Sequence, residues 1–254
     1  MRSEAELVSA ANLNYVGSFR KLSQHSAKGE IREVGRVTAF TTGAPLSLFN
    51  GCLVLEPATE AEVDAAVMWV SSLGFPYCVW MEEELATRLG DVVLARGLER
   101  HPWVEPGMVL HPPPEPPALP PGVTIVPGLA EHLGVLIEGG MPADIAHSLF
   151  PPSLANDPDV LLLTARIDGR PVGTSVALRT GDVAGVYAVG TLPVARRRGV
   201  GTAASWAAVA AGRAWGCETI VLQSSEMGLS VYSSMGFRTV RYVTFRRSAQ
   251  DQAV

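Results

Sequence analysis

Three consecutive arginines followed by two nearby glycines form the part of this chain best suited to binding an anion. They occur as Arg196-Arg197-Arg198-Gly199-Val200-Gly201, between a predicted strand and the first turn of a predicted helix. A helix start exposes about four unpaired N–H groups and the positive end of the helix dipole. Arginine adds forked donors for phosphate oxygens, and glycine lets the backbone approach a ligand closely. The pattern predicts a pyrophosphate site, although taken alone it also fits a tight turn with a solvated basic cluster.

A second string of interest lies further along the chain and contains a tyrosine. Tyr232 lies in the string SEMGLSVYSSMGF, residues 225–237, which predicts a short helix near 227–235. Taken by itself, the tyrosine is interpreted as a helix aromatic packed into the core.

The elements around these residues predict an antiparallel meander followed by a β-loop-α-β unit. Asp168-Gly169 has the chemistry of a hairpin turn, and Gly216 suits the left-handed position after a helix. Such an order is typical of an α/β fold with a mixed sheet, or α+β. The predicted strands are 123–127, 159–167, 172–179, 184–190, 218–224 and 237–246, and the predicted helices are 129–139, 142–149 and 200–215.

The first half of the chain also predicts strands packed against helices. Thr59 and Glu62 have the spacing of a capping box at the start of a helix. Asn50-Gly51 is interpreted as a turn. The predicted helices are 3–13, with an extension toward Leu22, 59–73 and 82–97, and the predicted strands are 34–41, 48–56 and 76–81.

A proline-rich segment separates the two halves. Seven of the twelve residues in HPPPEPPALPPG, residues 111–122, are proline, which excludes a helix or a central strand. The segment predicts a semi-rigid spacer, and a ligand for a proline-binding module is the alternative. We therefore expect domains at 1–111 and 122–254, joined by a linker at 112–121.

Composition narrows the class of protein. With 254 residues, 47% hydrophobic and 18% charged, the chain is expected to fold into packed domains. Its net charge of −5 and the absence of a basic face argue against nucleic acid as a partner, and its apolar runs are too short for a membrane span. The cysteines at 52, 78 and 217 form no disulfide or metal-binding pattern. We expect a cytoplasmic protein without a metal.

Together the two motifs resemble the GNAT superfamily of N-acetyltransferases. The spacing Arg-x-x-Gly-x-Gly, with Pro193 three residues before the first arginine, is similar to the coenzyme A loop of that superfamily. Residues 225–237 are similar to its last characteristic block, with Ser225 where many members have asparagine. The resemblance covers roughly residues 122–247 and implies the acyl-CoA N-acyltransferase fold.

The resemblance also implies roles for individual residues. The end of the central strand would hold the pantetheine and the thioester carbonyl, Ser225 would contact the pantetheine arm, and Tyr232 would be the catalytic acid. The implied reaction transfers an acetyl group from acetyl-CoA, as co-substrate, to a primary amine of a small molecule or peptide. The residues implied to bind the cofactor are Val189, Gly190 and Thr191 at the strand end, Arg196, Arg197, Arg198, Gly199, Val200, Gly201 and Thr202 around the pyrophosphate, and Ser225.

Two features leave alternatives open. Many members of the superfamily carry a carboxylate on the central strand, whereas residues 184–190 contain none, so no general base is assigned. A non-catalytic acyl-CoA-binding or regulatory protein is therefore the alternative function.

In the first half, residues 48–51, 75–80 and 94–99 resemble the degenerate first domain of two-domain actinobacterial members, which implies two GNAT-like domains in tandem. A second copy of the chain, in a homodimer, is a further candidate partner.

Overall fold

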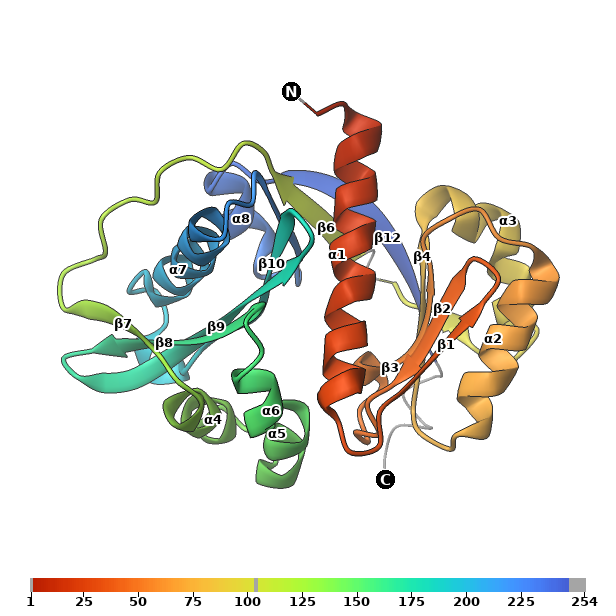
Figure 1. Ribbon diagram of the computed structural model, residues 1–254, viewed down its shortest axis with the longest axis horizontal. Helices are drawn as coiled ribbons and strands as arrows, with labels where there is room; N and C mark the ends of the chain where they lie inside the picture. The colour runs from red at the N-terminus through yellow and green to blue at the C-terminus, as the bar shows by residue number, and fades with distance from the viewer. Residues whose placement is uncertain (1, 103–104, 247–254) are drawn as a thin grey trace. The chain divides into compact units, whose positions relative to one another are not determined.

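The computed structural model describes residues 2–102 and 105–246, which form two compact units (Figure 1). The meander unit consists of the described residues of 1–18 and 108–239. The hairpin unit consists of those of 19–107 and 240–254. Each unit is thus assembled from two separate stretches of chain. The division into domains at 1–111 and 122–254 stays a prediction, and residues 247–254 lie outside the described residues.

The meander unit is built on a mixed sheet in the order β6-β11-β10-β9-β8-β7. Strands β7 to β10 pair antiparallel, and β10 pairs parallel with β11 after a helical crossover, which confirms the predicted mixed α/β fold. In chain order its elements are the first part of α1 (Glu4–His25), the last part of β6 (Glu105–Leu110), β7 (Val123–Pro127), α4 (Leu129–Glu138), α5 (Ala143–Leu149), α6 (Pro152–Ala155), β8 (Val160–Ile167), β9 (Arg170–Thr180), β10 (Val183–Thr191), α7 (Val200–Ala214), β11 (Thr219–Gln223) and α8 (Leu229–Ser234).

Local chemistry sets the ends of these elements. Asp168 and Gly169 both have positive φ, 50° and 81°, as the turn between two directly joined antiparallel strands requires. Gly216 follows α7 with a φ of 81°. Its N–H donates to the Arg213 carbonyl and the N–H of Cys217 donates to the Gly212 carbonyl, both at 2.9 Å. This is a Schellman motif, and it confirms the predicted end of the long helix.

Helices cover both faces of the meander sheet (Figure 1). On one face, Ser175 Oγ of β9 donates to the Ala204 carbonyl of α7 at 2.7 Å. On the other, Arg166 of β8 forms an ion pair with Glu131 of α4. The core on the α7 side is apolar and includes Ala165, Val200, Ala203 and Ala204. Successive side chains of a strand point to opposite faces of the sheet. One set therefore contacts α7 and the other contacts α4.

The proline-rich segment differs from the predicted spacer, because it connects β6 to β7 within the meander unit. In Figure 1 it arches from β6 past α8 and α7 to β7. Near the end of α7, Arg213 donates to the Pro113 carbonyl at 2.5 Å and pairs with Glu115. Near the start of α7, a Cβ atom added to Gly199 would lie 3.3 Å from Pro120 Cγ. The segment is therefore a strap fixed near both ends of the helix.

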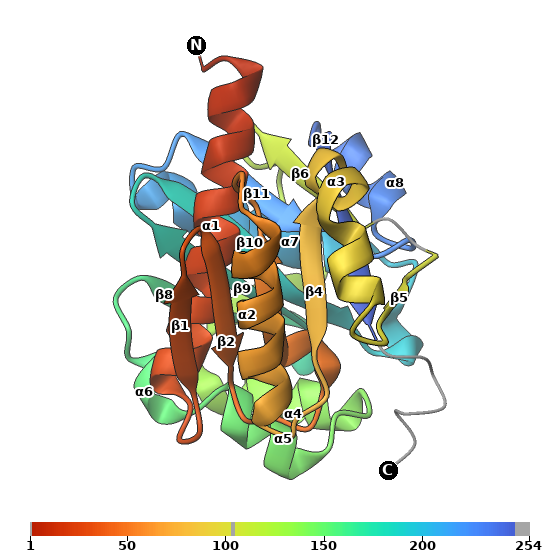
Figure 2. The ribbon, with the colours of Figure 1, turned by 90° about the vertical axis from the view of Figure 1, so that its right-hand side faces the viewer.

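The hairpin unit has its own mixed sheet, in the order β1-β2-β3-β4-β12, with β5 paired to β12. Helices α2 and α3 pack on this sheet (Figure 2). Its apolar core includes Val54, Val67 and Val79. The elements are β1 (Glu30–Val34), β2 (Val37–Thr41), β3 (Asn50–Val54), α2 (Glu60–Ser72), β4 (Cys78–Glu82), α3 (Glu83–Leu94), β5 (Glu99–Arg100) and β12 (Arg238–Arg246), together with the last part of α1.

Three local predictions in this unit have different outcomes. The capping box of Thr59 and Glu62 at the start of α2 is confirmed. The strand predicted at 34–41 is confirmed over 37–41 as β2 but begins too early, because Gly35, with a φ of 58°, turns the chain between β1 and β2. The turn predicted at Asn50-Gly51 is wrong: both residues belong to β3. Asn50 is fully buried and its amide donates to the carbonyls of Ala44, Leu46 and Pro76 at 2.9–3.1 Å. Its polar side chain therefore organises a loop.

Candidate functional site

The central strand of the meander unit separates from its parallel neighbour. Pairing between β10 and β11 covers only Val183–Gly185 opposite Thr219–Val221, yet β10 continues to Thr191 and β11 to Gln223. Beyond the paired part, the facing edges of the two strands offer backbone N–H and C=O groups that the ladder does not use. An edge of this kind can bind an extended, amide-containing ligand.

A bulge marks the point where β10 leaves the regular ladder. The register with β9 shifts between Tyr187 and Gly190, and Ala188 has a φ of 47°. Thr174 Oγ1 donates to the Ala188 carbonyl at 2.8 Å and holds the bulge in place. After the bulge, Gly190 and Thr191 pair again with β9, so the predicted residues 189–191 lie at the end of β10 where it has left β11. Bulges commonly redirect backbone groups next to ligand sites.

The arginine-glycine loop leads directly into α7. Arg197 and Gly199 have φ values of 61° and 75°, and Gly199 is the residue that precedes the helix. No side chain caps this helix start, and the first N–H paired with the loop belongs to Ala203, which donates to the Gly199 carbonyl at 2.9 Å. The N–H groups of Val200, Gly201 and Thr202 are those that a helix start leaves for a ligand.

The charge beside this helix start is not neutralised by the residues that the structure describes. Arg196, Arg197 and Arg198 are exposed, and no carboxylate among the described residues forms an ion pair with them. Nε of Arg196 donates to the Thr191 carbonyl at 3.4 Å, which ties the loop to the end of β10. Three cations beside uncapped N–H groups make a strongly anion-attracting position.

The strand end and the loop are brought together by close packing. A Cβ atom added to Gly201 would lie 3.3 Å from Thr191 Oγ1. A Cβ atom added to Gly173 would lie 2.6 Å from Val200 Cγ1 and 3.1 Å from the Gly190 carbonyl oxygen. Glycines at these positions let α7 begin directly against β9 and β10. The structure therefore places residues 189–191 and 196–202, predicted from sequence, in one continuous region.

Tyr232 lies on α8 with its ring buried. The ring packs edge-on against Phe237, with centroids 5.9 Å apart. Burial raises the pKa of the phenol, and a hydrogen bond with the Ser205 side chain partly opposes the rise. Ser205 Oγ in turn donates to the Gly201 carbonyl at 2.9 Å. The phenol is therefore protonated at neutral pH and linked through Ser205 to the first turn of α7. Both a core position and a proton-donating role are compatible with this placement.

Ser225 has a more local setting than the other predicted residues. It is exposed in the turn before α8, where its Oγ accepts from the Gly228 N–H at 3.3 Å. Its carbonyl accepts from the N–H groups of Gly228 and Leu229. These hydrogen bonds assign Ser225 to the turn, and among the described residues none of them connects it with the arginine-glycine loop.

One polar residue of this region was missed by the sequence analysis. Gln223 is the last residue of β11, beyond the part paired with β10. Its amide nitrogen and oxygen are buried and have no hydrogen-bond partner among the described residues. Buried amides are normally paired, so this side chain is a candidate for contact with a bound molecule or water. Nothing in the sequence distinguishes it from an ordinary polar residue at a strand end.

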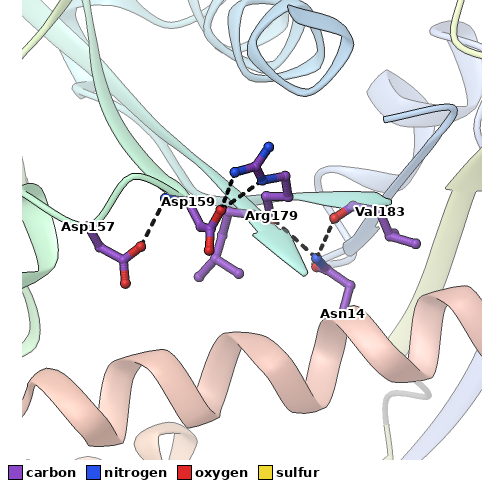
Figure 3. A network of polar contacts seen from close by, with 6 residues as sticks. Asn14, Asp157, Asp159, Arg179 and Val183 are labelled. Atoms are coloured by element: carbon purple, nitrogen blue, oxygen red, sulfur yellow. Dashed lines mark hydrogen bonds and ion pairs between the residues drawn. The ribbon is translucent and has the colours of Figure 1, made fainter. Parts of the chain in front are cut away.

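The N-terminal helix supports the strands that carry the site (Figure 3). Asn14 is fully buried, and its amide donates to the carbonyls of Leu178 and Val183 at 3.1 and 3.2 Å. The hydroxyl of Tyr187, next to the bulge, donates to Asn14 Oδ1 at 2.6 Å. At the same end of the sheet, Nε of Arg179 donates to Asp159 Oδ1 at 2.7 Å. Figure 3 draws this contact beside Asn14. Residues from the start of the chain thus hold β9 and β10 together.

Comparison with known proteins agrees with this geometry. Residues 137–237 match the family model described as the acetyltransferase (GNAT) family. A search of curated proteins found no match.

Solved structures resemble the chain over most of its length. A GCN5-related N-acetyltransferase from Kribbella flavida has a TM-score of 0.68 and 20% identity, covering 93% of this chain and 95% of the other. A tandem GNAT protein from the clavulanic acid biosynthesis pathway has a TM-score of 0.60 and 13% identity, with coverages of 96% and 95%. A GCN5-related N-acetyltransferase from Sphaerobacter thermophilus has a TM-score of 0.54 and 23% identity, with coverages of 74% and 66%.

These findings define a class. The chain has the acyl-CoA N-acyltransferase fold, and residues 137–237 of it match the GNAT family model. Across the described residues, no helix has the length and apolar character needed to cross a bilayer. In that same part of the chain, no three His, Cys, Asp or Glu side chains gather as metal ligands would.

Proposed function

We propose that the chain transfers an acetyl group from acetyl-CoA to a primary amine of a small-molecule or peptide acceptor. The observation that carries this proposal is the uncapped start of α7, with three unneutralised arginines, directly beside the bulged end of β10. Consider one ligand whose anionic group binds at the start of α7 and whose extended arm lies along the separated strands. The far end of that ligand would then lie at the bulge of β10. Acetyl-CoA has this combination of a pyrophosphate and an amide-containing arm.

The reaction needs few groups from the protein. The neutral amine attacks the thioester carbonyl carbon, and N–H groups at the end of β10 would stabilise the oxyanion. As the carbon–sulfur bond breaks, the phenol of Tyr232 would donate its proton to the thiolate. The raised pKa of Tyr232, caused by burial, keeps this proton in place at neutral pH.

Calorimetric titration with acetyl-CoA and with CoA tests the first step. We expect both to bind at sub-millimolar concentration, and with similar affinity, because the pyrophosphate and arm are shared. An absence of binding to either compound at that concentration would contradict the proposal. The acceptor is then sought by measuring thiol release across a panel of primary amines.

One observation favours a second candidate function. Strand β10, Val183–Thr191, contains no carboxylate that could help to deprotonate an amine. A chain that binds acetyl-CoA but releases no thiol with any amine would fit a non-catalytic acyl-CoA-binding or regulatory protein. Thiol release with at least one amine rules this alternative out.

The hairpin unit, the location of the protein and its partners are also matters of proposal. We propose that the hairpin unit is a degenerate GNAT-like domain, because the structural likeness to a tandem GNAT protein covers 96% of the chain. The scattered cysteines support a cytoplasmic location, and all three are buried and form no disulfide within the part of the chain that the structure describes. Nucleic acid and membrane are not proposed as partners, and a homodimer is tested by the mass of the chain in solution.

A further inference from the structure

Two buried polar atoms in the meander unit lack the partners that buried groups normally have. His132, on α4, and Thr164, on β8, are both fully buried. Neither His132 Nε2 nor Thr164 Oγ1 finds a hydrogen-bond partner among the described residues. Groups of this kind are usually satisfied by ordered water or have a function that keeps them open.

The hydrogen bond of the other ring nitrogen fixes the state of His132. Its Nδ1 lies 3.2 Å from the carbonyl oxygen of Leu163. Because a carbonyl oxygen only accepts, Nδ1 carries the hydrogen, and Nε2 of the neutral ring holds a free lone pair. Burial lowers the pKa of His132, partly offset by the bond to Leu163, so the ring is neutral at pH 7. The side chain is a base with nothing bound to it.

Two threonine hydroxyl groups lie on the face of the sheet that α4 covers, and one of them contacts the bulge of β10. Thr164 stands directly opposite Thr174 in the register of β8 and β9, so both side chains lie on the same face, with Cβ atoms about 5 Å apart. That face is the one covered by α4, because the next outward residue on it, Arg166, pairs with Glu131 of α4. Thr174 Oγ1 donates to the Ala188 carbonyl at 2.8 Å, in the bulge itself.

We propose, on the basis of the function proposed above, that His132 accepts the proton that the amine loses, through water held between the hydroxyls of Thr164 and Thr174. The amine nitrogen bonds to the thioester carbon and the carbon–sulfur bond breaks. The proton leaving the nitrogen passes by water to Nε2 of His132, while the thiolate takes the proton of Tyr232. The imidazolium and the phenolate return to their starting states by exchange with solvent.

In this proposal, His132 takes the role of the carboxylate that β10 lacks. Strand β10 carries no carboxylate, whereas α4 carries a neutral imidazole that contacts β8 at Leu163, next to Thr164. The charged groups on α4 and the elements packed against it are engaged with each other or exposed. They are the pairs Glu131–Arg166, Glu138–Arg170 and Asp159–Arg179, and the exposed Asp144 and His147 of α5.

Replacing His132 by glutamine tests the proposal, with His147→Gln as the matched control. His147 Nδ1 also lies close to a carbonyl oxygen, that of Ala143 at 2.6 Å, but the side chain is exposed. We expect kcat at pH 7.5 to fall about 100-fold in His132→Gln, the usual size of a general-base effect. The KM for acetyl-CoA should stay within twofold of the wild-type value. His147→Gln should behave as wild type.

The pH profile separates a chemical role from a structural one. Because neutral His132 is the active form and its pKa is lowered, wild-type kcat should rise with pH through that pKa and then level off. The rise should be absent in His132→Gln. A wild-type chain that turns over while His132→Gln keeps its kcat and its profile contradicts this inference alone. A wild-type chain that releases no thiol contradicts the proposed function instead.

A second pair of variants decides the question if His132→Gln does not fold. Thr164→Val keeps the shape and removes the hydroxyl, whereas Thr164→Ser keeps the hydroxyl. We expect kcat to fall about tenfold in the valine variant and to recover in the serine variant, since a proton path needs the oxygen. Equal kcat values in the two variants would overturn the proposal. Nitrogen NMR of labelled histidine gives a readout independent of turnover, and a hydrogen on Nε2 of His132 would also overturn it.

Discussion

At the residue scale, Tyr232 and the arginine-glycine loop are connected by one side chain. The hydrogen bond between Ser205 and Tyr232 and the bond from Ser205 to the Gly201 carbonyl join α8 to the first turn of α7. The proposed proton donor and the proposed anion site thus share a rigid support. Rigid elements hold a catalytic group more accurately than a loop does.

Removing the phenol of Tyr232 tests its role. We predict that Tyr232→Phe lowers kcat about 100-fold, because a general acid contributes at least that much, while acetyl-CoA affinity stays within twofold. Tyr77→Phe is the control, since Tyr77 is similarly buried but belongs to the hairpin unit. Thiol-release kinetics and calorimetry give both values. Wild-type kcat in Tyr232→Phe would assign the ring to the core.

Enlarging Gly201 tests the anion site without touching the arginines. A Cβ atom at this position already lies 3.3 Å from Thr191 Oγ1, so Gly201→Trp should fill the region above the helix start and abolish acetyl-CoA binding. Gly134→Trp is the matched control, because Gly134 is an exposed helical glycine with open space around it. Calorimetry measures both, and thermal unfolding checks that each variant is folded. Normal affinity in Gly201→Trp would show that the loop is misassigned.

At the element scale, the accuracy of the sequence predictions follows the range of the interactions involved. The meander, the long helix with its Gly216 end and the capping box of α2 depend on alternation and on residues within one turn, so the sequence carries them. Strand β6 and the strap depend on contacts such as Arg213 with Pro113, 100 positions apart. His132 and Gln223 become candidates only through the missing partners of buried atoms. Their residue types and spacing carry no such information.

The buried contact of α1 with β9 and β10 makes a quantitative prediction. Asn14→Ala removes the amide that donates to the carbonyls of Leu178 and Val183 and one of the partners of the Tyr187 hydroxyl. We expect the free energy of unfolding to fall by about 3 kcal/mol, since each buried group left unpaired costs about 1–3 kcal/mol. Leu13→Ala, on the exposed side of the same helix, should cost less than about 0.5 kcal/mol. Urea unfolding measures both, and equal values would show that the network is not stabilising.

At the scale of the whole molecule, the two compact units do not follow the order of the chain. The meander unit needs residues from the first 18 positions, and the hairpin unit needs the last strand. The segment that resembles the GNAT superfamily is therefore an incomplete folding unit on its own. The two units are thus interleaved along the chain.

Fragments test this interleaving. We predict that residues 108–254 alone lose the cooperative thermal unfolding of the full chain, because the surface of β9 and β10 that binds Asn14 is left uncovered. Adding a peptide of residues 2–25 should restore part of the transition, whereas the same peptide carrying Asn14→Ala should not. Circular dichroism follows the unfolding. A fragment as stable as the full chain would contradict the predicted dependence.

Asn14 is far in sequence from its hydrogen-bond partners, and this affects the chain while it is being synthesised. The carbonyl of Leu178 is 164 positions further along the chain. At about 5–20 residues per second, a ribosome makes that stretch in roughly 8–33 seconds. Throughout this interval the part of the helix that carries Asn14 lacks β9 and β10, the strands that bind it. Newly made chains are therefore expected to depend on chaperones until the meander emerges, however stable the finished protein is.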